Sequence, residues 1–187
     1  EHLSVEEAIE LLADCSIGLG SWGTPSPDAQ LLEGCPHLRL WVHAAGSVKR
    51  MFGPHLEGRN LVIASCAPAI AEDVAEITLA QLIIGLKRTL ENAAANRTGP
   101  TPKPTNSRTL ASATVGVIGA SHVGRRVIRN LLPFGPRILL YDPFTSAEQA
   151  GEIGAEHVAD LLELCARSDA VTLHTPALPA TEKFLGA

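Results

Sequence analysis

A glycine-rich turn between an apolar strand and an amphipathic helix constrains the fold of this chain more than any other feature. Residues 114–118 form an apolar run rich in β-branched side chains, and the turn 119–124, with the sequence GASHVG, follows directly. We expect a strand over 114–118 and a helix over 123–132. This layout places the pyrophosphate of a dinucleotide at the N-terminus of the helix. The sequence therefore predicts a nucleotide-binding unit in the second half of the chain.

Asp142 supplies the second part of the dinucleotide pattern. It ends an apolar strand over 137–141, about 20 residues after the first glycine of the turn, where an acidic side chain accepts hydrogen bonds from the adenosine ribose. Its carboxylate repels a 2′-phosphate, and the following Pro143 and Phe144 supply no arginine to neutralise one. We therefore predict NAD as the cofactor in preference to NADP. The alternative is a turn-forming Asp-Pro pair with no ligand.

The turn departs from the ideal G-x-G-x-x-G pattern at its middle position. The three glycine positions hold Gly119, Ser121 and Gly124. The middle glycine normally lets the backbone approach the pyrophosphate closely, so a serine is expected to weaken or shift cofactor binding, although its hydroxyl can donate to phosphate. The amides of Ser121, His122, Val123 and Gly124 are the predicted pyrophosphate ligands. A tight turn without a ligand is the alternative.

Composition and charge exclude several other classes of function. The net charge of −5 argues against nucleic acid or an anionic membrane as the main partner. No apolar run reaches the roughly 18 residues of a membrane span, and no signal peptide is recognised at the first residues. The four cysteines are scattered without a C-x-x-C pair, so we expect no metal site and interpret them as reduced, mostly buried side chains of a cytoplasmic protein. A catalytic cysteine is the less favoured alternative.

The alternation of strand and helix patterns predicts an α/β protein with parallel sheets. The long helix 70–92 is apolar over a surface too broad for one stripe, so we expect it to be buried on more than one side, between two domains. A Pro-rich linker is expected over 97–112. The other predicted elements are a helix over 5–12 capped by Ser4, a buried strand over 17–20, a helix over 29–33, strands over 38–43 and 61–64, a helix over 159–165 and a strand over 170–174.

Five motifs follow one another in a recognisable order. They are 44–48 (AAGSV), 74–80 (VAEITLA), 114–119 (TVGVIG), 131–135 (LLPFG) followed by 141–143 (YDP), and 171–176 (VTLHTP). Together they resemble the D-isomer-specific 2-hydroxyacid dehydrogenases, and the resemblance covers nearly all of the chain. It implies a flavodoxin-like substrate domain over 1–95, without its C-terminal closing segment, and the N-terminal half of a Rossmann-type NAD-binding domain over 96–187.

The resemblance also assigns roles to individual residues. The backbone N–H groups of Ala45, Gly46 and Ser47 would bind the substrate carboxylate, although Val48-Lys49-Arg50 follows where the family has an aspartate or asparagine. The remaining assignments place Thr78 at the nicotinamide-side phosphate, His122 at a phosphate, Pro143 in the ribose-binding turn, and His174 and Pro176 beside the adenine or its ribose. Three of them have plainer alternatives: Thr78 bonds to the preceding helical turn, His122 is an exposed loop residue, and His174 is a strand-end residue with no role.

The activity implied by the resemblance is hydride transfer between NAD(H) and a 2-hydroxy or 2-oxo acid, in a protein that dimerises through its coenzyme domain. The family's catalytic arginine, glutamate and histidine lie on later elements, so we nominate no catalytic residue. We expect a C-terminally truncated piece that is inactive alone. A regulatory module like the family's NAD-sensing corepressors is the alternative. Another Rossmann enzyme, such as adenosylhomocysteine hydrolase, fits the glycine turn but not residues 74–80.

Overall fold

The structure is a computed structural model that describes residues 3–25, 27–52, 56, 58–99 and 107–186. Its contacts group the chain into two compact units, residues 1–70 with 176–187, and residues 71–175. This grouping places most of the long helix α4 (Ala67–Leu86) with the second unit. The division into a substrate domain over 1–95 and an NAD-binding domain over 96–187 stays a prediction.

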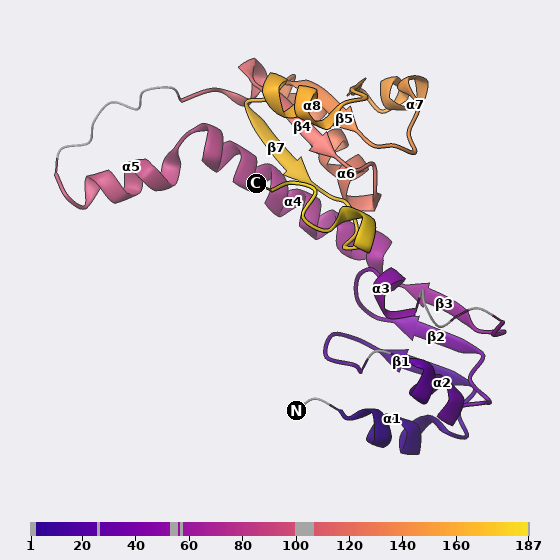
Figure 1. Cartoon of the computed structure of the whole chain (residues 1–187). Coiled ribbons are helices and arrows are strands. Elements are labelled where there is room, and N and C mark those ends of the chain that lie inside the picture. The colour runs from indigo at the N-terminus through magenta and orange to yellow at the C-terminus, as the bar shows by residue number, and fades with distance from the viewer. Residues whose placement is uncertain (1–2, 26, 53–55, 57, 100–106, 187) are drawn as a thin grey trace. The chain divides into compact units, whose positions relative to one another are not determined.

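The first unit is built on a three-stranded parallel sheet in the order β1-β2-β3 (Figure 1). Its strands are β1 (Ile17–Gly20), β2 (Leu40–His43) and β3 (Val62–Ser65). Its helices are α1 (Val5–Leu12), α2 (Ala29–Gly34) and the short α3 (Lys49–Phe52). The predicted strands and the first two helices are thus confirmed, with ends that differ by one or two residues.

Local signals explain why these elements form where they do. Ser4 caps α1 as predicted, because its hydroxyl accepts a bond from the Glu7 amide at 3.2 Å and the Glu7 carboxylate accepts one from the Ser4 amide at 2.8 Å. In the core, Trp41 packs edge-on against Phe52, with 5.6 Å between ring centroids. The indole of Trp41 also fills the space that a side chain at Gly18 would need.

The expectation that the first strand is buried holds for only one of its faces. Gly18 and Gly20 face the core, but Ile17 and Leu19 are exposed on the opposite face. The strand lies at the edge of its sheet, and the core residues of this unit cover only the face that carries Trp41. An apolar run alone could not reveal this, because a four-residue strand looks the same whether one or both faces are covered.

The second unit is built on a four-stranded parallel sheet in the order β6-β5-β4-β7 (Figure 1). The strands are β4 (Thr114–Ile118), β5 (Arg137–Tyr141), β6 (Glu156–His157) and β7 (Ala170–Leu173). Besides α4, the helices are α5 (Thr89–Asn96), α6 (His122–Leu131), α7 (Ala147–Glu152) and α8 (Leu161–Arg167). The predicted α/β fold with parallel sheets is confirmed, while α7 and the two-residue β6 were not predicted.

The long helix differs from expectation in two ways. It ends at Leu86, whose carbonyl accepts a bond from the Arg108 amide at 2.9 Å, and Arg88 then adopts a left-handed conformation (φ 53°) before α5 begins. It is also buried along one face only, through Ala75, Leu82 and Leu86, while Ile77 is 54% exposed. The predicted linker lies partly outside the described residues, and its last part forms a 3₁₀ turn over Leu110–Ser112.

Candidate cofactor-binding site

The glycine turn brings the end of β4 against the start of α6 so closely that two of its positions require glycine. Gly119 has a φ of +95°, in the left-handed region that other residues rarely adopt. A Cβ added at Gly124 would overlap the carbonyl oxygen of Gly119. These are the tight turn and the close helix–strand approach that a dinucleotide-binding turn uses.

Ser121 acts as the N-cap of α6, which begins at His122, one residue earlier than predicted. Its Oγ accepts a bond from the Gly124 amide at 3.3 Å, so that amide already has a protein partner. The amides of His122 and Val123 have no acceptor within the helix, because the first amides of any helix lack one. Together with the Ser121 hydroxyl hydrogen, they give this turn three donors suited to a phosphate.

Asp142 joins the end of β5 to the glycine turn. Its Oδ2 accepts a bond from the Ala120 amide at 2.7 Å, and its Oδ1 accepts bonds from the Phe144 amide at 2.8 Å and the Thr145 hydroxyl at 3.2 Å. The Asp142 side chain therefore stabilises the turn that follows it, and it also lies beside the glycine turn, as predicted. A carboxylate has about four acceptor positions, so capacity for a ribose hydroxyl remains.

His174 lies immediately after β7, against the same turn. Its amide donates to the Ile118 carbonyl at 2.8 Å, and its backbone lies where a Cβ at Gly119 would make contact. The imidazole Nε2 is 2.8 Å from the Thr172 hydroxyl. The structure thus gathers the predicted residues Gly119, Ser121, Gly124, Asp142 and His174 at one edge of the sheet.

Burial of the His174 imidazole lowers its pKa. A histidine whose pKa is lowered in the folded state binds protons more readily in the unfolded state. The contribution of His174 to stability is therefore full at pH values above the ordinary histidine pKa, near 6.5, and is lost as the pH falls below that value. We expect the unfolding temperature of the native chain to fall more steeply between pH 7 and pH 5 than that of His174→Gln. Equal slopes in thermal unfolding followed by circular dichroism would contradict this.

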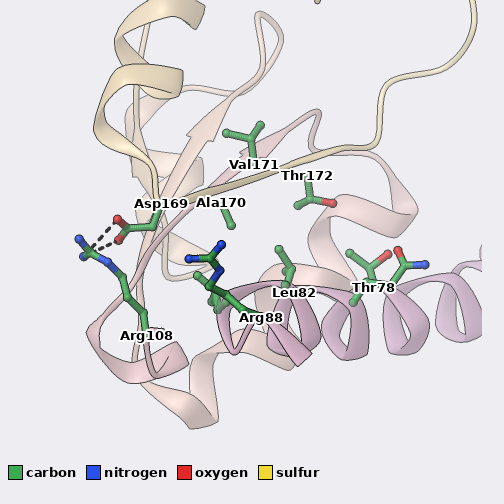
Figure 2. A pocket seen from close by; sticks show the side chains of 11 residues that line it. Thr78, Leu82, Arg88, Arg108, Asp169, Ala170, Val171 and Thr172 are labelled. Atoms are coloured by element: carbon green, nitrogen blue, oxygen red, sulfur yellow. Dashed lines mark hydrogen bonds and ion pairs between the residues drawn. The ribbon is translucent and has the colours of Figure 1, made fainter. Parts of the chain in front are cut away.

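Thr78 lies on α4. Its hydroxyl donates to the Val74 carbonyl at 2.6 Å, which is the plainer alternative considered for it. It also lines a cavity of about 520 Å³ between α4 and β7, which contains no residue of the turn. Figure 2 shows Thr78 and Leu82 on the helix side of this cavity and Thr172 on the strand side. A role of Thr78 at the cofactor stays a prediction.

The sequence analysis did not predict the contacts by which arginines of α6 stabilise the glycine turn and attach α6 to α4. Arg125 donates through Nε to the Ala120 carbonyl at 2.9 Å. Arg126 donates to the Glu72 carboxylate at 2.8 Å, and Arg129 pairs with the same carboxylate, so α6 is tied to α4. These bonds lower the pKa of Glu72, the Arg126 bond most of all. Nothing local in the sequence indicates that Glu72 meets residues more than 50 positions away.

The predicted substrate loop follows β2 in the first unit. The Ala44 amide donates to the Gly20 carbonyl at 2.7 Å, Ala45 is fully buried, and the Ser47 hydroxyl accepts a bond from the Lys49 amide at 3.4 Å. A Cβ at Gly46 would meet nothing within 4 Å, so the space beside this glycine is open. Pro176 groups by contacts with this first unit, whereas Pro143 follows Asp142 in the second. The binding roles of these residues stay predictions.

Two other expectations bear on the kind of site. All four cysteines are free thiols, but only Cys35 is buried, so the expectation that most are buried is wrong. Burial raises the pKa of the Cys35 thiol, as expected for a packing residue. Over the described parts of the chain, no three histidine, cysteine or acidic side chains group as metal ligands, and no helix has the length and apolar character to cross a membrane.

Comparison with known proteins identifies the family. The model of the D-isomer specific 2-hydroxyacid dehydrogenase NAD binding domain matches residues 77–187, more than half of the chain. D-3-phosphoglycerate dehydrogenase from Methanocaldococcus jannaschii is 28% identical over 185 residues, 98% of this chain and 35% of that protein. D-lactate dehydrogenase from Leuconostoc mesenteroides subsp. cremoris is 38% identical over 84 residues, 45% of this chain and 25% of that protein. The chain therefore spans about a third of the length of such curated relatives.

Solved structures share the fold. An acyclic imino acid reductase (Bsp5) in complex with NADPH and D-Arg matches with a TM-score of 0.78 at 22% identity, covering 95% of this chain and 56% of that one. A D-lactate dehydrogenase from Aquifex aeolicus complexed with NAD and lactic acid matches with a TM-score of 0.68, covering 91% and 51%. The proteins named here are dehydrogenases or reductases. The chain belongs to the D-isomer-specific 2-hydroxyacid dehydrogenase family, and it contains residues of that family's NAD-binding domain.

Proposed function

We propose that this chain serves an NAD-dependent oxidoreductase that transfers a hydride between NAD(H) and a 2-hydroxy or 2-oxo acid. The observation that carries the proposal is the glycine turn closed by Asp142, on a stretch that matches the family's NAD-binding domain. When bound, NAD supplies or accepts the hydride at its nicotinamide ring. The remaining work of binding and orientation falls to residues of the protein.

The turn fits a dinucleotide in its donors and its shape. The amides of His122 and Val123 and the hydroxyl of Ser121 bind the pyrophosphate, where the positive end of the α6 dipole adds to the attraction. Asp142 binds the adenosine ribose while it keeps the Ala120 amide in place. His174 and Pro176 are assigned to the adenine or its ribose, and Pro143 to the ribose-binding turn. The carboxylate of Asp142 repels a 2′-phosphate, which supports NAD over NADP.

The substrate side of the proposal rests on the loop after β2. The amides of Ala45, Gly46 and Ser47 bind the carboxylate of the 2-hydroxy or 2-oxo acid, and the open space beside Gly46 admits it. We further propose a cytoplasmic protein, in keeping with its four free cysteines, that acts on small molecules as a homodimer.

Titration of the chain with NADH tests the cofactor assignment directly. We expect saturable binding to one site, measured by calorimetry, and weaker binding of NADPH. Because none of the described residues is assigned a catalytic role, we expect no steady-state oxidation of NADH by 2-oxo acids with these 187 residues alone. Absence of NADH binding would contradict the proposal, and turnover would contradict the absence of catalytic residues.

A further inference from the structure

The backbone of Ala120, the residue after Gly119 in the glycine turn, is held on both sides. Its amide donates to Asp142 Oδ2 at 2.7 Å, and its carbonyl accepts a bond from Arg125 Nε at 2.9 Å. Asp142 directly follows β5, whereas Arg125 lies in the first turn of α6. The two peptide groups that flank Ala120 are therefore each fixed by a charged side chain.

The bond from Arg125 also sets the direction of a neighbouring amide. A peptide group is planar and trans, so the Ala120 carbonyl and the Ser121 amide share one plane and point in opposite directions. Among the residues that the structure describes, the Ser121 amide has no acceptor. It is therefore a fourth donor for a phosphate, directly before the amides of His122 and Val123 in the chain.

Ser121 occupies the middle position of the glycine pattern without backbone strain. Its φ is −67° and its ψ is 179°, an extended conformation that any residue adopts. Its hydroxyl oxygen already accepts the bond from the Gly124 amide that caps α6. Both donors of Ser121, the amide and the hydroxyl hydrogen, thus belong to one residue, and the orientation of its peptide group decides where they point.

The contacts of Arg125 differ from those of the other two arginines of α6. Arg126 and Arg129 form ion pairs with Glu72 and attach α6 to α4. Over the described part of the chain, the exposed side chain of Arg125 has no carboxylate partner, and its hydrogen bond is to the Ala120 carbonyl. A role in attaching α6 to α4 therefore does not account for Arg125, whose contact is with the glycine turn.

We propose that Arg125 is a positioning residue for cofactor binding, because it holds the peptide group between Ala120 and Ser121 in the orientation that presents Ser121 to the pyrophosphate. It acts through the hydrogen bond of its Nε and does not touch the cofactor. This inference rests on the proposed function, since it takes the glycine turn as the pyrophosphate site. It adds a residue outside the glycine pattern on which the affinity for NADH depends.

Three substitutions of Arg125 separate its hydrogen bond from its charge. The amide nitrogen of glutamine is bonded to Cδ, as Nε is in arginine, so Arg125→Gln keeps a donor at the same point of the side chain and loses the charge. Arg125→Lys keeps the charge but has a carbon at that point, and Arg125→Met removes both. In calorimetric titrations with NADH, we expect Arg125→Met and Arg125→Lys to raise the Kd about fivefold, within the range that one hydrogen bond represents. Arg125→Gln should stay close to the native Kd.

Arg137→Met is the matched control. It removes the same charge from the start of β5, whereas the glycine turn follows the end of the neighbouring strand β4. The ion pair that it breaks, with Glu156, is exposed and contributes little to stability. This variant should bind NADH as the native chain does. Thermal unfolding followed by circular dichroism shows that each variant is folded before its Kd is compared.

Two fragments of the cofactor distinguish positioning of the turn from a general loosening of the site. ADP-ribose contains the pyrophosphate, so Arg125→Met should weaken its binding by the same factor as that of NADH. Adenosine has no phosphate, so its affinity, measured by displacement of NADH, should not change. Equal losses for ADP-ribose and adenosine would mean that Arg125 supports the site as a whole and would overturn the inference.

The remaining outcomes separate the inference from the function on which it rests. Tighter binding of NADH by Arg125→Gln than by Arg125→Lys supports positioning through the hydrogen bond. The reverse order would mean that the charge attracts the cofactor directly, and equal affinities would mean that the bond has no effect; either result overturns the inference and leaves the proposed function standing. If the native chain does not bind NADH, the proposed function and the inference are both overturned.

Discussion

Replacement of Gly124 by alanine is expected to abolish measurable NADH binding and to destabilise the second unit by about 3 kcal/mol or more, because the added methyl group overpacks a rigid contact. The Cβ would overlap the carbonyl oxygen of Gly119, an atom of the backbone that no side-chain rotation can move aside. Relief requires α6 to move away from β4. That movement also displaces the amides of His122 and Val123, so stability and cofactor affinity fall together.

Thermal unfolding followed by circular dichroism, with and without NADH, measures both effects. Gly151→Ala is the matched control, because Gly151 is exposed on α7 and a Cβ there meets nothing within 4 Å. That variant should be as stable as the native chain or more stable by up to about 1 kcal/mol, since alanine favours a helix. A Gly124→Ala protein that unfolds at the native temperature and still binds NADH would contradict the close approach seen here.

The parts of the fold that could be predicted are those with local signals. The glycine turn, β4 and β5 were predicted with their correct bounds or nearly so, because an apolar β-branched run and a glycine turn act over a few residues. The Ser4 cap of α1 is likewise a contact between residues three apart. Such features depend little on the rest of the molecule.

The parts that could not be predicted depend on distant contacts. Gly85 lies within the last turn of α4, but neither glycine nor proline directly follows Leu86, where the helix ends and the Leu86 carbonyl meets the amide of Arg108. The pairing of Glu72 with arginines of α6 likewise joins residues far apart in the sequence. The two-residue β6 is too short to leave a periodic pattern, and it exists through its pairing with β5. In the site, sequence located Asp142 but not the bond that ties its carboxylate to the Ala120 amide.

That bond makes Asp142→Ala the second variant with a large expected effect. The carboxylate would both bind the ribose and hold the glycine turn, and hydrogen bonds to a charged group contribute about 1.5–3 kcal/mol each. We expect the affinity for NADH to fall by roughly 10- to 150-fold, which is the range that one such bond represents. The affinity for NADPH should fall less, because the variant also removes the charge that repels a 2′-phosphate.

Two further variants separate the ribose contact from the turn. Asp142→Asn keeps the shape and one acceptor oxygen but loses the charge, so we expect an intermediate loss of NADH affinity and a smaller preference for NADH over NADPH. Asp160→Ala removes a carboxylate that caps α8 through the Glu163 amide, at 2.7 Å. It should cost about 1 kcal/mol of stability without changing either affinity. Calorimetric titration of all three variants with both cofactors measures these affinities. If Asp142→Ala lost equal affinity for NADH and for NADPH, Asp142 would shape the turn without contacting the ribose.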